Sequence, residues 1–450
     1  MQGTSTGPQD AAGVELGAPA LPLAAYPPKA PEQLGWRHYA TFFLLMLVAA
    51  LSYVDRQIFT LFQDDIKAEL GLNDGQLGLL TGLSFALFYT VAAFPIARYA
   101  DHGDRRLVIS LSVIVWSAAT AACGMAHSFW TMMLARVGLA AGEAGAGPAS
   151  NALLVQIFPP HRRGIVISTM LAASAVGISG GLALGGWLSQ WYGWREVFLL
   201  VGMPGIALGV AVWLVTLEPR RARGVVVTRG AADQIPVREV LHTLAGNPSL
   251  RWVALVLSTV PVVGFALILW GPSFLRRVHG MGTAEVGFWL GGAMLLGLVI
   301  GNLLAGWLAD RYGARDPRFN GWLAAGGLFL AFPFAVGFAL VDSAYVALAC
   351  FVVVKFLMTL HLGPIIVLSF AQVKEPMRAI TQATINMLIG LAGTGVGGTA
   401  AGILSTYFAP TWGEESLRPA LLTLSVLLLV GGFAALRAAQ TARPLPENVA

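Results

Sequence analysis

GWLADRYGAR at residues 306–315 and ARYADHGDRR at residues 97–106 are two short charged segments that each follow a long apolar stretch. Asp101 and Asp310 occupy the same place in the two segments and are 209 positions apart (310 − 101). Both segments combine small residues, an aspartate and arginines. A repeat at this long interval predicts a duplicated chain, with one copy of the unit in each half.

Two rows of small residues support the duplication. Both rows have a spacing of four residues, which places small side chains on one helix face and lets helix backbones approach closely in lipid. Their first residues are 213 positions apart (390 − 177), close to the interval between the two aspartates. One such row is common in membrane helices, but two rows and two charged loops at one interval favour duplication. The rows are Gly177, Gly181 and Gly185, and Gly390, Thr394, Gly398 and Gly402.

The composition requires lipid as a solvent. Of the 450 residues, 56% are hydrophobic and 11% are charged, whereas a soluble domain carries about 25% charged residues. The net charge of +5 comes from short clusters between apolar stretches, so we expect no nucleic-acid partner. Cys123 and Cys350 lie in apolar runs, and the seven histidines form no ligand pattern. We therefore expect no disulfide, no metal and no cofactor.

Twelve apolar stretches approach the length of about 20 residues that a membrane-spanning helix needs. Of the 28 Lys and Arg residues, 20 fall on the side of the two termini, 5 fall on the other side and 3 lie within spans. Because basic residues concentrate in cytoplasmic loops, this bias predicts an even number of spans and cytoplasmic termini. The predicted spans are 39–62, 75–97, 107–126, 129–158, 164–190, 196–217, 250–275, 284–309, 319–340, 344–371, 379–407 and 418–438.

We therefore predict an all-α membrane protein whose twelve transmembrane helices form two pseudo-symmetric six-helix bundles. The acidic segment QDDIKAELGL at 63–72 is expected to be a surface loop rather than a gate. The predicted parts are a disordered cytoplasmic tail at 1–36, bundles at 37–217 and 250–440, a cytoplasmic linker at 218–249 and a cytoplasmic tail at 441–450.

Five charged residues matter most, because each lies inside a predicted span, where a charge near the bilayer centre costs about 2.5–3.5 kcal/mol. Three of them lie at a similar depth, roughly 22–24 Å from the cytoplasmic end of their helices at 1.5 Å per residue. Arg136 precedes Glu143 by seven residues and shares its helix face. The five residues are Asp55, Arg56, Arg136, Glu143 and Lys355.

These charges suggest a proton-coupling mechanism. In our hypothesis Asp55 and Glu143 accept protons, and their proton affinity changes with access to water and with the arginine that lies beside them. A change of arginine partner, Arg56 or Arg136, would then link proton binding to conformation. The alternative is that the acids and arginines form static pairs that only stabilise the bundle.

The second half supplies a lone cation for a substrate anion. We expect Lys355 and His361 to attract the anionic group, with Tyr53 and Phe265 beside it. Lys355 could instead pair with an acid of the first half, and His361 could fill a polar gap in its helix. Aromatic residues could line an apolar cavity or face lipid: Phe85, Phe88, Phe94, Phe265, Trp270, Phe274 and Phe356.

The loop Gly-x-x-x-Asp-Arg-x-Gly-x-Arg at 306–315 resembles the signature loop of the major facilitator superfamily. The resemblance covers residues 37 to 440 and implies two cytoplasmic loops that act as conformational latches. The first copy is degenerate, since Ala97, His102 and Asp104 depart from the pattern. The alternative is that these charges only set the topology. The implied latch residues are Asp101, Arg105, Arg106, Asp310, Arg311 and Arg315.

Four segments, at 52–58, 86–95, 136–144 and 191–195, resemble the spinster-like branch of that superfamily, and two of them resemble its motifs. These two are Tyr53-Val-Asp55-Arg56 in the first span and Arg136 to Ala144, which ends Gly-Glu143-Ala, in the fourth. The resemblance implies coupling and gating roles for Asp55, Arg56, Arg136 and Glu143. Eukaryotic members of the branch move lysophospholipids and sphingosine phosphates. The chain departs from the pattern after Glu143, where Gly145 and Ala146 replace Ser-Tyr.

The expected function is secondary active transport by alternating access, coupled to H⁺, of an amphiphilic anion such as a lysophospholipid or a sphingoid phosphate. The alternative is a transporter or exporter of a small organic anion or a drug. No nucleophile–base pair or filter ring is recognised, so we expect neither an enzyme nor a channel. We expect a monomer, surrounded by membrane lipids, in a bacterial inner membrane.

Overall fold

The computed structural model describes residues 34–219, 246–313 and 315–442. The predicted tails and most of the predicted linker lie outside these residues. Within them the secondary structure is helical. Apolar side chains face lipid along these helices, and the helical backbone satisfies its own hydrogen bonds where no water is available.

The N-terminal half begins with α1, the longest of its helices. Its 35 residues contain neither Gly nor Pro, and it ends at Gly71 in the left-handed conformation (φ 64°). The helices of this half are α1 (Trp36–Leu70), α2 (Asp74–Thr81), α3 (Leu83–His102), α4 (Arg105–Gly124), α5 (Phe129–Glu143), α6 (Ala146–Ile157), α7 (Pro160–Leu188) and α8 (Trp194–Val215).

The C-terminal half has the same arrangement of antiparallel helices, and two π-helical segments, η2 and η4, interrupt it. Its main elements are α10 (Pro248–His279), α11 (Thr283–Leu308), η2 (Ala309–Gly313), α12 (Arg318–Leu340), α13 (Ala344–Phe370), α14 (Arg378–Ile389), η4 (Gly390–Gly397), α15 (Gly398–Trp412) and α16 (Leu417–Thr441). Short 3-10 turns, η3 (Glu375–Met377) and η5 (Gly413–Ser416), precede α14 and α16.

The described helices make twelve crossings, as predicted, although ten stretches are continuous and apolar enough to cross a membrane by length and composition. The fourth crossing is divided into α5 and α6, because Pro148 has no N–H to continue the helix across residues 144–145. The stretch Ile380–Thr441 contains two crossings, which reverse at Gly413 (φ 54°).

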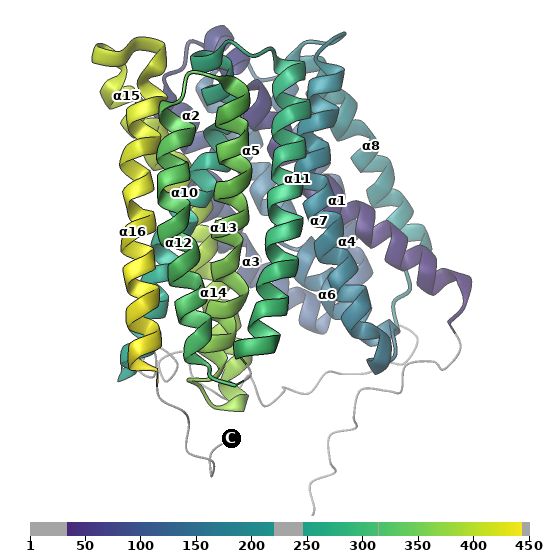
Figure 1. Cartoon of the computed structure of the whole chain (residues 1–450). Helices are drawn as coiled ribbons and strands as arrows, with labels where there is room; N and C mark the ends of the chain where they lie inside the picture. Colours follow the sequence, from purple (N-terminus) through teal and green to yellow (C-terminus); the bar gives the residue numbers. More distant parts are fainter. Residues whose placement is uncertain (1–33, 220–245, 314, 443–450) are drawn as a thin grey trace, which may run out of the picture.

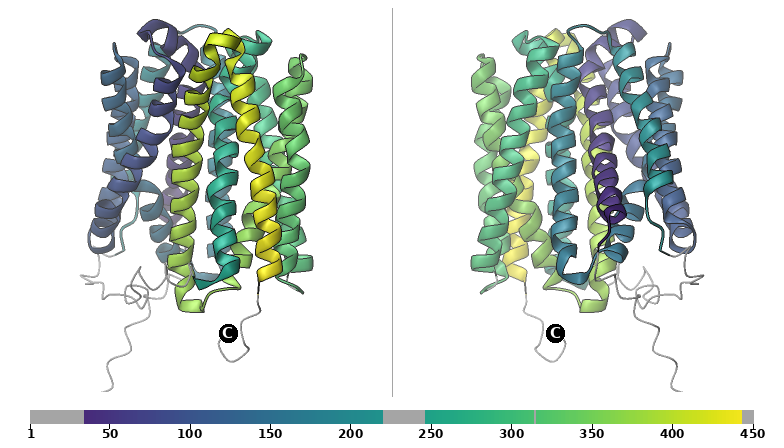
Figure 2. Two further views of the ribbon diagram at one scale, coloured as in Figure 1. Left: turned by 90° about the vertical axis from the view of Figure 1, so that its left-hand side faces the viewer. Right: turned by 90° about the vertical axis from the view of Figure 1, so that its right-hand side faces the viewer.

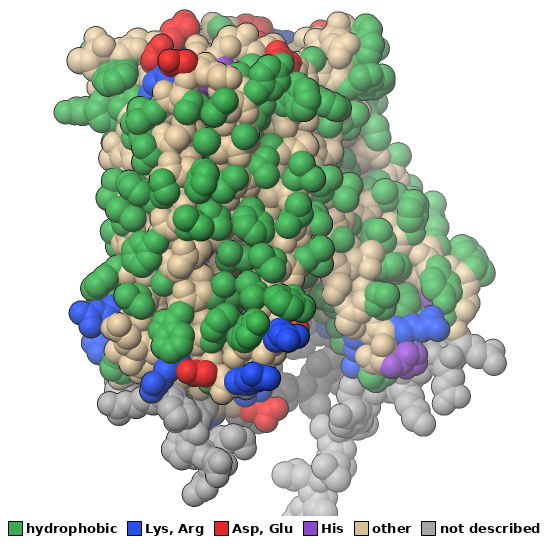
Figure 3. Space-filling model, viewed as in Figure 1, with side chains coloured by type: hydrophobic (Ala, Val, Ile, Leu, Met, Phe, Trp, Pro, Cys, Tyr) green, Lys and Arg blue, Asp and Glu red, His purple; other side chains and the backbone are tan. Residues whose placement is uncertain are grey.

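The two halves stand side by side in the bundle (Figures 1 and 2). α1 begins and α16 ends at the same face, which we call the terminal face, and the other end is the opposite face (Figure 1). Lys and Arg gather at the terminal face in the view of Figure 3, whereas Asp and Glu predominate at the opposite face.

The halves pack tightly near the opposite face, through glycines. A Cβ on Gly287 of α11 would lie 2.4 Å from the carbonyl oxygen of Leu182 on α7, and one on Gly82 would lie 2.5 Å from Oγ1 of Thr399. Thr399 of α15 also donates to Gly78 O (3.0 Å) and accepts from the Leu83 amide (2.9 Å). Toward the terminal face the surface is hollowed between the halves (Figure 3). The structure is therefore closed at the opposite face.

Close helix approach within the N-terminal half yields a stability prediction. Gly177 of α7 faces α1, where an added Cβ would lie 2.3 Å from the carbonyl oxygen of Ala50. Overpacking of this kind costs about 1–3 kcal/mol, so Gly177→Ala should lower the melting temperature in detergent. Gly180→Ala on the same helix is the control, because a Cβ there meets nothing within 4 Å. Equal melting temperatures for the two variants would contradict this packing.

Candidate functional site

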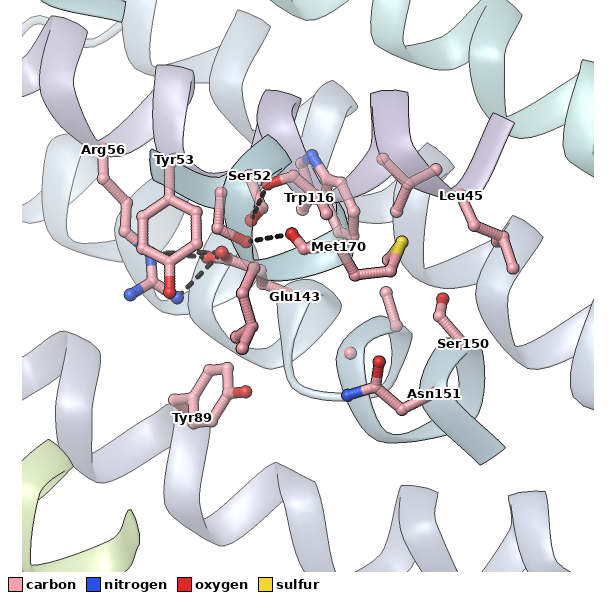
Figure 4. A pocket seen from close by; sticks show the side chains of 16 residues that line it. Leu45, Ser52, Tyr53, Arg56, Tyr89, Trp116, Glu143, Ser150, Asn151 and Met170 are labelled. Carbon is pink, nitrogen blue, oxygen red and sulfur yellow. Dashed lines mark hydrogen bonds and ion pairs between the residues drawn. The ribbon is translucent and has the colours of Figure 1, made fainter. Parts of the chain in front are cut away.

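A cavity of about 220 Å³ lies inside the N-terminal half, between α1, α3, α4, α5, α6 and α7 (Figure 4). One part of its wall is charged or aromatic, and the rest is apolar with several hydroxyls. Its lining residues include Arg56, Glu143, Tyr53 and Tyr89, the apolar Leu45, Val48, Met170 and Leu171, and the polar Ser52, Ser150, Asn151 and Ser174. The cavity therefore offers both polar and apolar contacts.

An ion pair forms the charged part of this wall. Nη2 of Arg56 donates to Oε1 of Glu143 at 2.8 Å, and Nε lies 3.1 and 3.2 Å from the two carboxylate oxygens. The Arg56 guanidinium also lies over the rings of Phe85 (4.4 Å) and Tyr53 (5.4 Å). The structure thus brings Arg56, Glu143 and Tyr53 together, three of the residues predicted for the site.

Asp55 is buried in the interior of the N-terminal half and does not line the cavity. Its side chain is 2% exposed, and both carboxylate oxygens lack a hydrogen-bond partner among the described residues. Its polar surroundings include Trp116 and Thr120 of α4 and Arg136 of α5. An unsatisfied buried carboxylate costs several kcal/mol, so Asp55 is an energetically costly residue at this position.

Arg136 forms no ion pair with an acid in the described structure, so the predicted pairing with Asp55 or Glu143 is absent here. The arginine is 3% exposed, its Nε donates to the Leu80 carbonyl oxygen at 3.2 Å, and its guanidinium lies 4.5 Å from the centre of the Phe59 ring. Arg136 is therefore a buried cation whose Nη1 donates no hydrogen bond to any described residue.

Lys355, His361 and Phe265 lie in the C-terminal half and do not line this cavity. Nζ of Lys355 reaches Gly264 O at 3.5 Å, and His361 contacts the Met358 carbonyl oxygen on its own helix through Nδ1. Both basic residues are buried in α13. The structure does not bring these residues to the Arg56–Glu143 pair.

Of the two alternatives for the seven aromatic residues, cavity lining does not hold for this cavity. None of the seven aromatic residues lines it. Trp270 and Phe274 are fully buried in the core between helices, whereas Phe88 and Phe94 are 40% and 71% exposed. Phe85 is buried beneath the Arg56 guanidinium. Helical spacing alone could not separate core and lipid-facing positions from cavity positions.

The two predicted latch loops lie at the terminal face. Oε2 of Glu218, which follows α8, accepts from the Arg105 amide at 2.8 Å, and Arg106 lies 3.7 Å from Asp104. These bonds stay within the N-terminal half. Asp310, Arg311 and Arg315 are exposed, and Arg311 lies over the Trp307 ring (5.6 Å). The Asp101 side chain lies outside the described part, so the latch role stays a prediction.

A cluster of charges joins the halves at the opposite face. Arg277 donates to Asp64 (2.6 and 2.8 Å) and to Asp74 (2.7 and 2.9 Å), and Arg276 donates to Asp65 (2.7 and 2.9 Å). Both arginines end α10, and all three acids belong to the N-terminal half. We call these five residues the seam cluster.

Asp74 is the most heavily bonded acid of the seam cluster. It is 4% exposed, and besides Arg277 it contacts Lys67 Nζ at 2.7 Å and accepts from Ser405 Oγ at 2.7 Å. Ser405 lies on α15, so Asp74 binds two helices of the C-terminal half. Buried, bidentate hydrogen bonds of this kind contribute more to the stability of the closed seam than an exposed ion pair would.

The seam cluster corrects our expectation for segment 63–72. Residues 63–70 continue α1, and Gln63 is buried and donates to Leu269 O and to Ser273 Oγ across the seam. The segment is therefore part of a closed interface and not a surface loop. A signal was present, because Arg276 and Arg277 are adjacent on the side where basic residues are rare, and three aspartates of the first half lie on the same side.

Removal of one seam partner should open the opposite face. Breaking a buried ion pair from one side costs about 3–5 kcal/mol, so Asp74→Asn should expose the seam more often. Ser273→Cys, combined with Cys123→Ser and Cys350→Ser, provides a reporter that is 1% exposed. A membrane-impermeant maleimide should label it several times faster in Asp74→Asn. Glu69→Gln is the control, because Glu69 pairs with Arg195 inside one half; equal labelling rates would contradict the assignment.

Comparisons with known proteins agree with this architecture. A family model described as Major Facilitator Superfamily matches residues 45–394. An MFS-type efflux pump of Mycolicibacterium smegmatis is 30% identical over 400 residues, which cover 88% of this chain and 91% of that protein. Protein spinster homolog 1 of Xenopus tropicalis is 25% identical over 344 residues, 71% of this chain and 64% of that protein.

A solved structure shares the fold of this chain. It is the crystal structure of a bacterial homolog to the human lysosomal transporter Spinster, in an inward-facing and unoccupied conformation. Its TM-score is 0.81 at 28% identity, and the match covers 91% of this chain and 98% of that one. These matches confirm the resemblance to spinster-like transporters, and the chain belongs to the Major Facilitator Superfamily.

Proposed function

We propose that this protein is a proton-coupled secondary transporter of an amphiphilic anion, and that the structure is its inward-open state. The observation that carries the proposal is Asp55, a carboxyl group with no hydrogen bond among the described residues, buried in the N-terminal half near the Arg56–Glu143 pair. The closed seam and the hollow at the terminal face support a bundle that alternates between two states.

The proposed orientation puts the terminal face in the bacterial cytoplasm. In the sequence, 20 Lys and Arg residues fall on the side of the two termini and 5 fall on the other side. Figure 3 shows Lys and Arg at the terminal face. This bias favours a cytoplasmic side. The protein then works as a monomer in the inner membrane, with both termini inside.

Proton binding supplies the coupling in this proposal. A proton on Asp55 removes the cost of burying an unsatisfied charge. A proton on Glu143 weakens its hold on Arg56 and releases the guanidinium toward the cavity. Arg136, with a free donor, then serves as the second partner for whichever acid is charged. Rocking of the two halves changes the access of these groups to water and so couples proton flow to conformation.

The proposed substrate combines an anionic group with an apolar part. Arg56 is the cation on the cavity wall, and Tyr53 and Tyr89 provide hydroxyls beside it. Leu45, Val48, Met170 and Leu171 supply the apolar wall. Lys355 is a second, buried cation for the anion once the C-terminal half moves. A lysophospholipid or a sphingoid phosphate has this chemistry, and the similarity to spinster-like transporters agrees with it.

A small organic anion or a drug is the second candidate. The cavity volume of about 220 Å³ favours it, because an intact lysolipid is larger than this space. The relative from Mycolicibacterium smegmatis, an efflux pump, also supports an exporter. Either substrate uses the same cation on the cavity wall.

Asp55→Asn tests the coupling. The amide cannot bind a proton at this position, so a proton gradient across proteoliposomes should no longer drive accumulation of a labelled anionic lysophospholipid. Exchange of the same compound without a gradient should persist, because it needs only rocking of the halves. Glu69→Gln serves as the matched control and should accumulate substrate normally. Full gradient-driven accumulation by Asp55→Asn would remove Asp55 from the coupling mechanism.

A competition experiment tests the substrate class. Anionic lysophospholipids should raise the melting temperature of the purified protein and compete with transport of a labelled member of the class. Arg56→Gln should lose most of this shift, because a charge-assisted hydrogen bond is worth about 1.5–3 kcal/mol. If small organic acids shift the melting temperature and lysophospholipids do not, the second candidate replaces the first.

A further inference from the structure

Arg276 and Arg277 are bound by acids of the other half. The two guanidiniums make six hydrogen bonds to Asp64, Asp65 and Asp74, each 2.6–2.9 Å long. Arg276 also donates to the Leu61 carbonyl oxygen at 3.2 Å. Alternating access requires the halves to separate here, so opening must break these bonds together.

Separation leaves the two walls with opposite charge. On the N-terminal wall, Lys67 continues to pair with Asp74, since both belong to that half (2.7 Å). No acid of the C-terminal half bonds either arginine in the described structure. Glu414 of that half faces the same space but makes no described hydrogen bond or ion pair. The C-terminal wall of an open seam therefore carries two adjacent guanidiniums without a bonded carboxylate.

A vestibule of about 750 Å³ adjoins the seam cluster at the opposite face. Both halves line it, and its wall combines the charged seam residues with apolar side chains. The apolar residues are Ala68, Leu72, Met281 and Ala409. This combination of adjacent guanidiniums and apolar wall suits an anionic group attached to an apolar body.

We propose that Arg276 and Arg277 form a second anion-binding station, which becomes available when the opposite face opens. The inference rests on the proposed function. When the opposite face opens and the three aspartates move away, the anionic group of the substrate binds the two arginines. Arginine binds carboxylate and phosphate oxygens through two parallel N–H donors. In the open state a substrate anion therefore accepts the hydrogen bonds that Asp64, Asp65 and Asp74 accept in the closed state. A ligand that binds only the open state shifts the equilibrium toward it.

Two variants break the same four bonds from opposite sides. Arg277→Gln removes the cation, whereas the double variant Asp64→Asn/Asp74→Asn removes both acids of Arg277 and keeps the cation. If the seam cluster is only a closing device, both variants should have the same kinetics. If Arg277 also binds substrate, only Arg277→Gln should weaken binding from the opposite face.

The experiment uses full-length protein in proteoliposomes. Initial rates are measured for lysophosphatidic acid, which is anionic, and for lysophosphatidylcholine of equal chain length, which is zwitterionic, added on the side of the opposite face. Arg277→Gln should raise the KM for lysophosphatidic acid about tenfold, as expected for the loss of a charge-assisted contact. The Asp double variant should keep or lower that KM. The KM for lysophosphatidylcholine should differ little between the two variants.

The outcomes separate this inference from the proposed function. Equal KM changes for lysophosphatidic acid in both variants would overturn the anion station and leave the proposed function in place. Absence of saturable transport of lysophosphatidic acid by the wild-type protein would overturn the proposed substrate class. A substrate-independent check is available: at equal ionic strength, sulfate should accelerate maleimide labelling of Ser273→Cys more than chloride does, and Arg277→Gln should remove the difference. Equal labelling rates in sulfate and in chloride, measured on Ser273→Cys with Arg277 intact, would also overturn the anion station.

Discussion

The close packing of the two halves at one end is the constraint on which the rest of the structure depends. Glycines of α7 and α11 bring backbones together there, and a Cβ on Gly287 would lie 2.4 Å from a carbonyl oxygen. The same contact places Arg277 against Asp64 and Asp74. Among the described residues, the ion pairs that join the two halves lie at the opposite face, and the halves separate toward the terminal face.

Charge is distributed unequally between the halves. The N-terminal half contains the acids Asp55 and Glu143 together with two arginines, whereas Lys355 of the C-terminal half has, among the described residues, only a carbonyl contact of its Nζ at 3.5 Å. A bilayer makes each unsatisfied charge costly. This asymmetry agrees with our proposal that proton chemistry belongs to the N-terminal half and that the C-terminal half provides cations for an anion.

Much of this architecture follows from the sequence. Apolar length, the loop charges and the repeat of Asp101 and Asp310 predict twelve crossings in two halves, and buried charges such as Asp55 and Glu143 mark the interior of the first half. What sequence could not supply is which partner a charge takes. Arg56 and Arg136 are equivalent candidates for Glu143 in the sequence, and only the fold, which brings the Arg56 side chain of α1 within 2.8 Å of Glu143, selects Arg56. Likewise the acidic end of α1 has the composition of a loop, and its burial depends on arginines 200 positions later.

α1 links these two sites mechanically. Asp55 and Arg56 lie in its middle and Asp64 and Asp65 near its end, on one helix of 35 residues without Gly or Pro. Nine residues of α-helix separate Asp55 from Asp64, a distance of about 13–14 Å. Kinks in helices arise mainly at Pro, at Gly and at π-bulges, and α1 has none of these. α1 therefore moves as one rigid unit. A tilt of the helix at the buried Asp55 displaces Asp64 and Asp65 at the seam, because the helix has no flexible point at which it could bend instead.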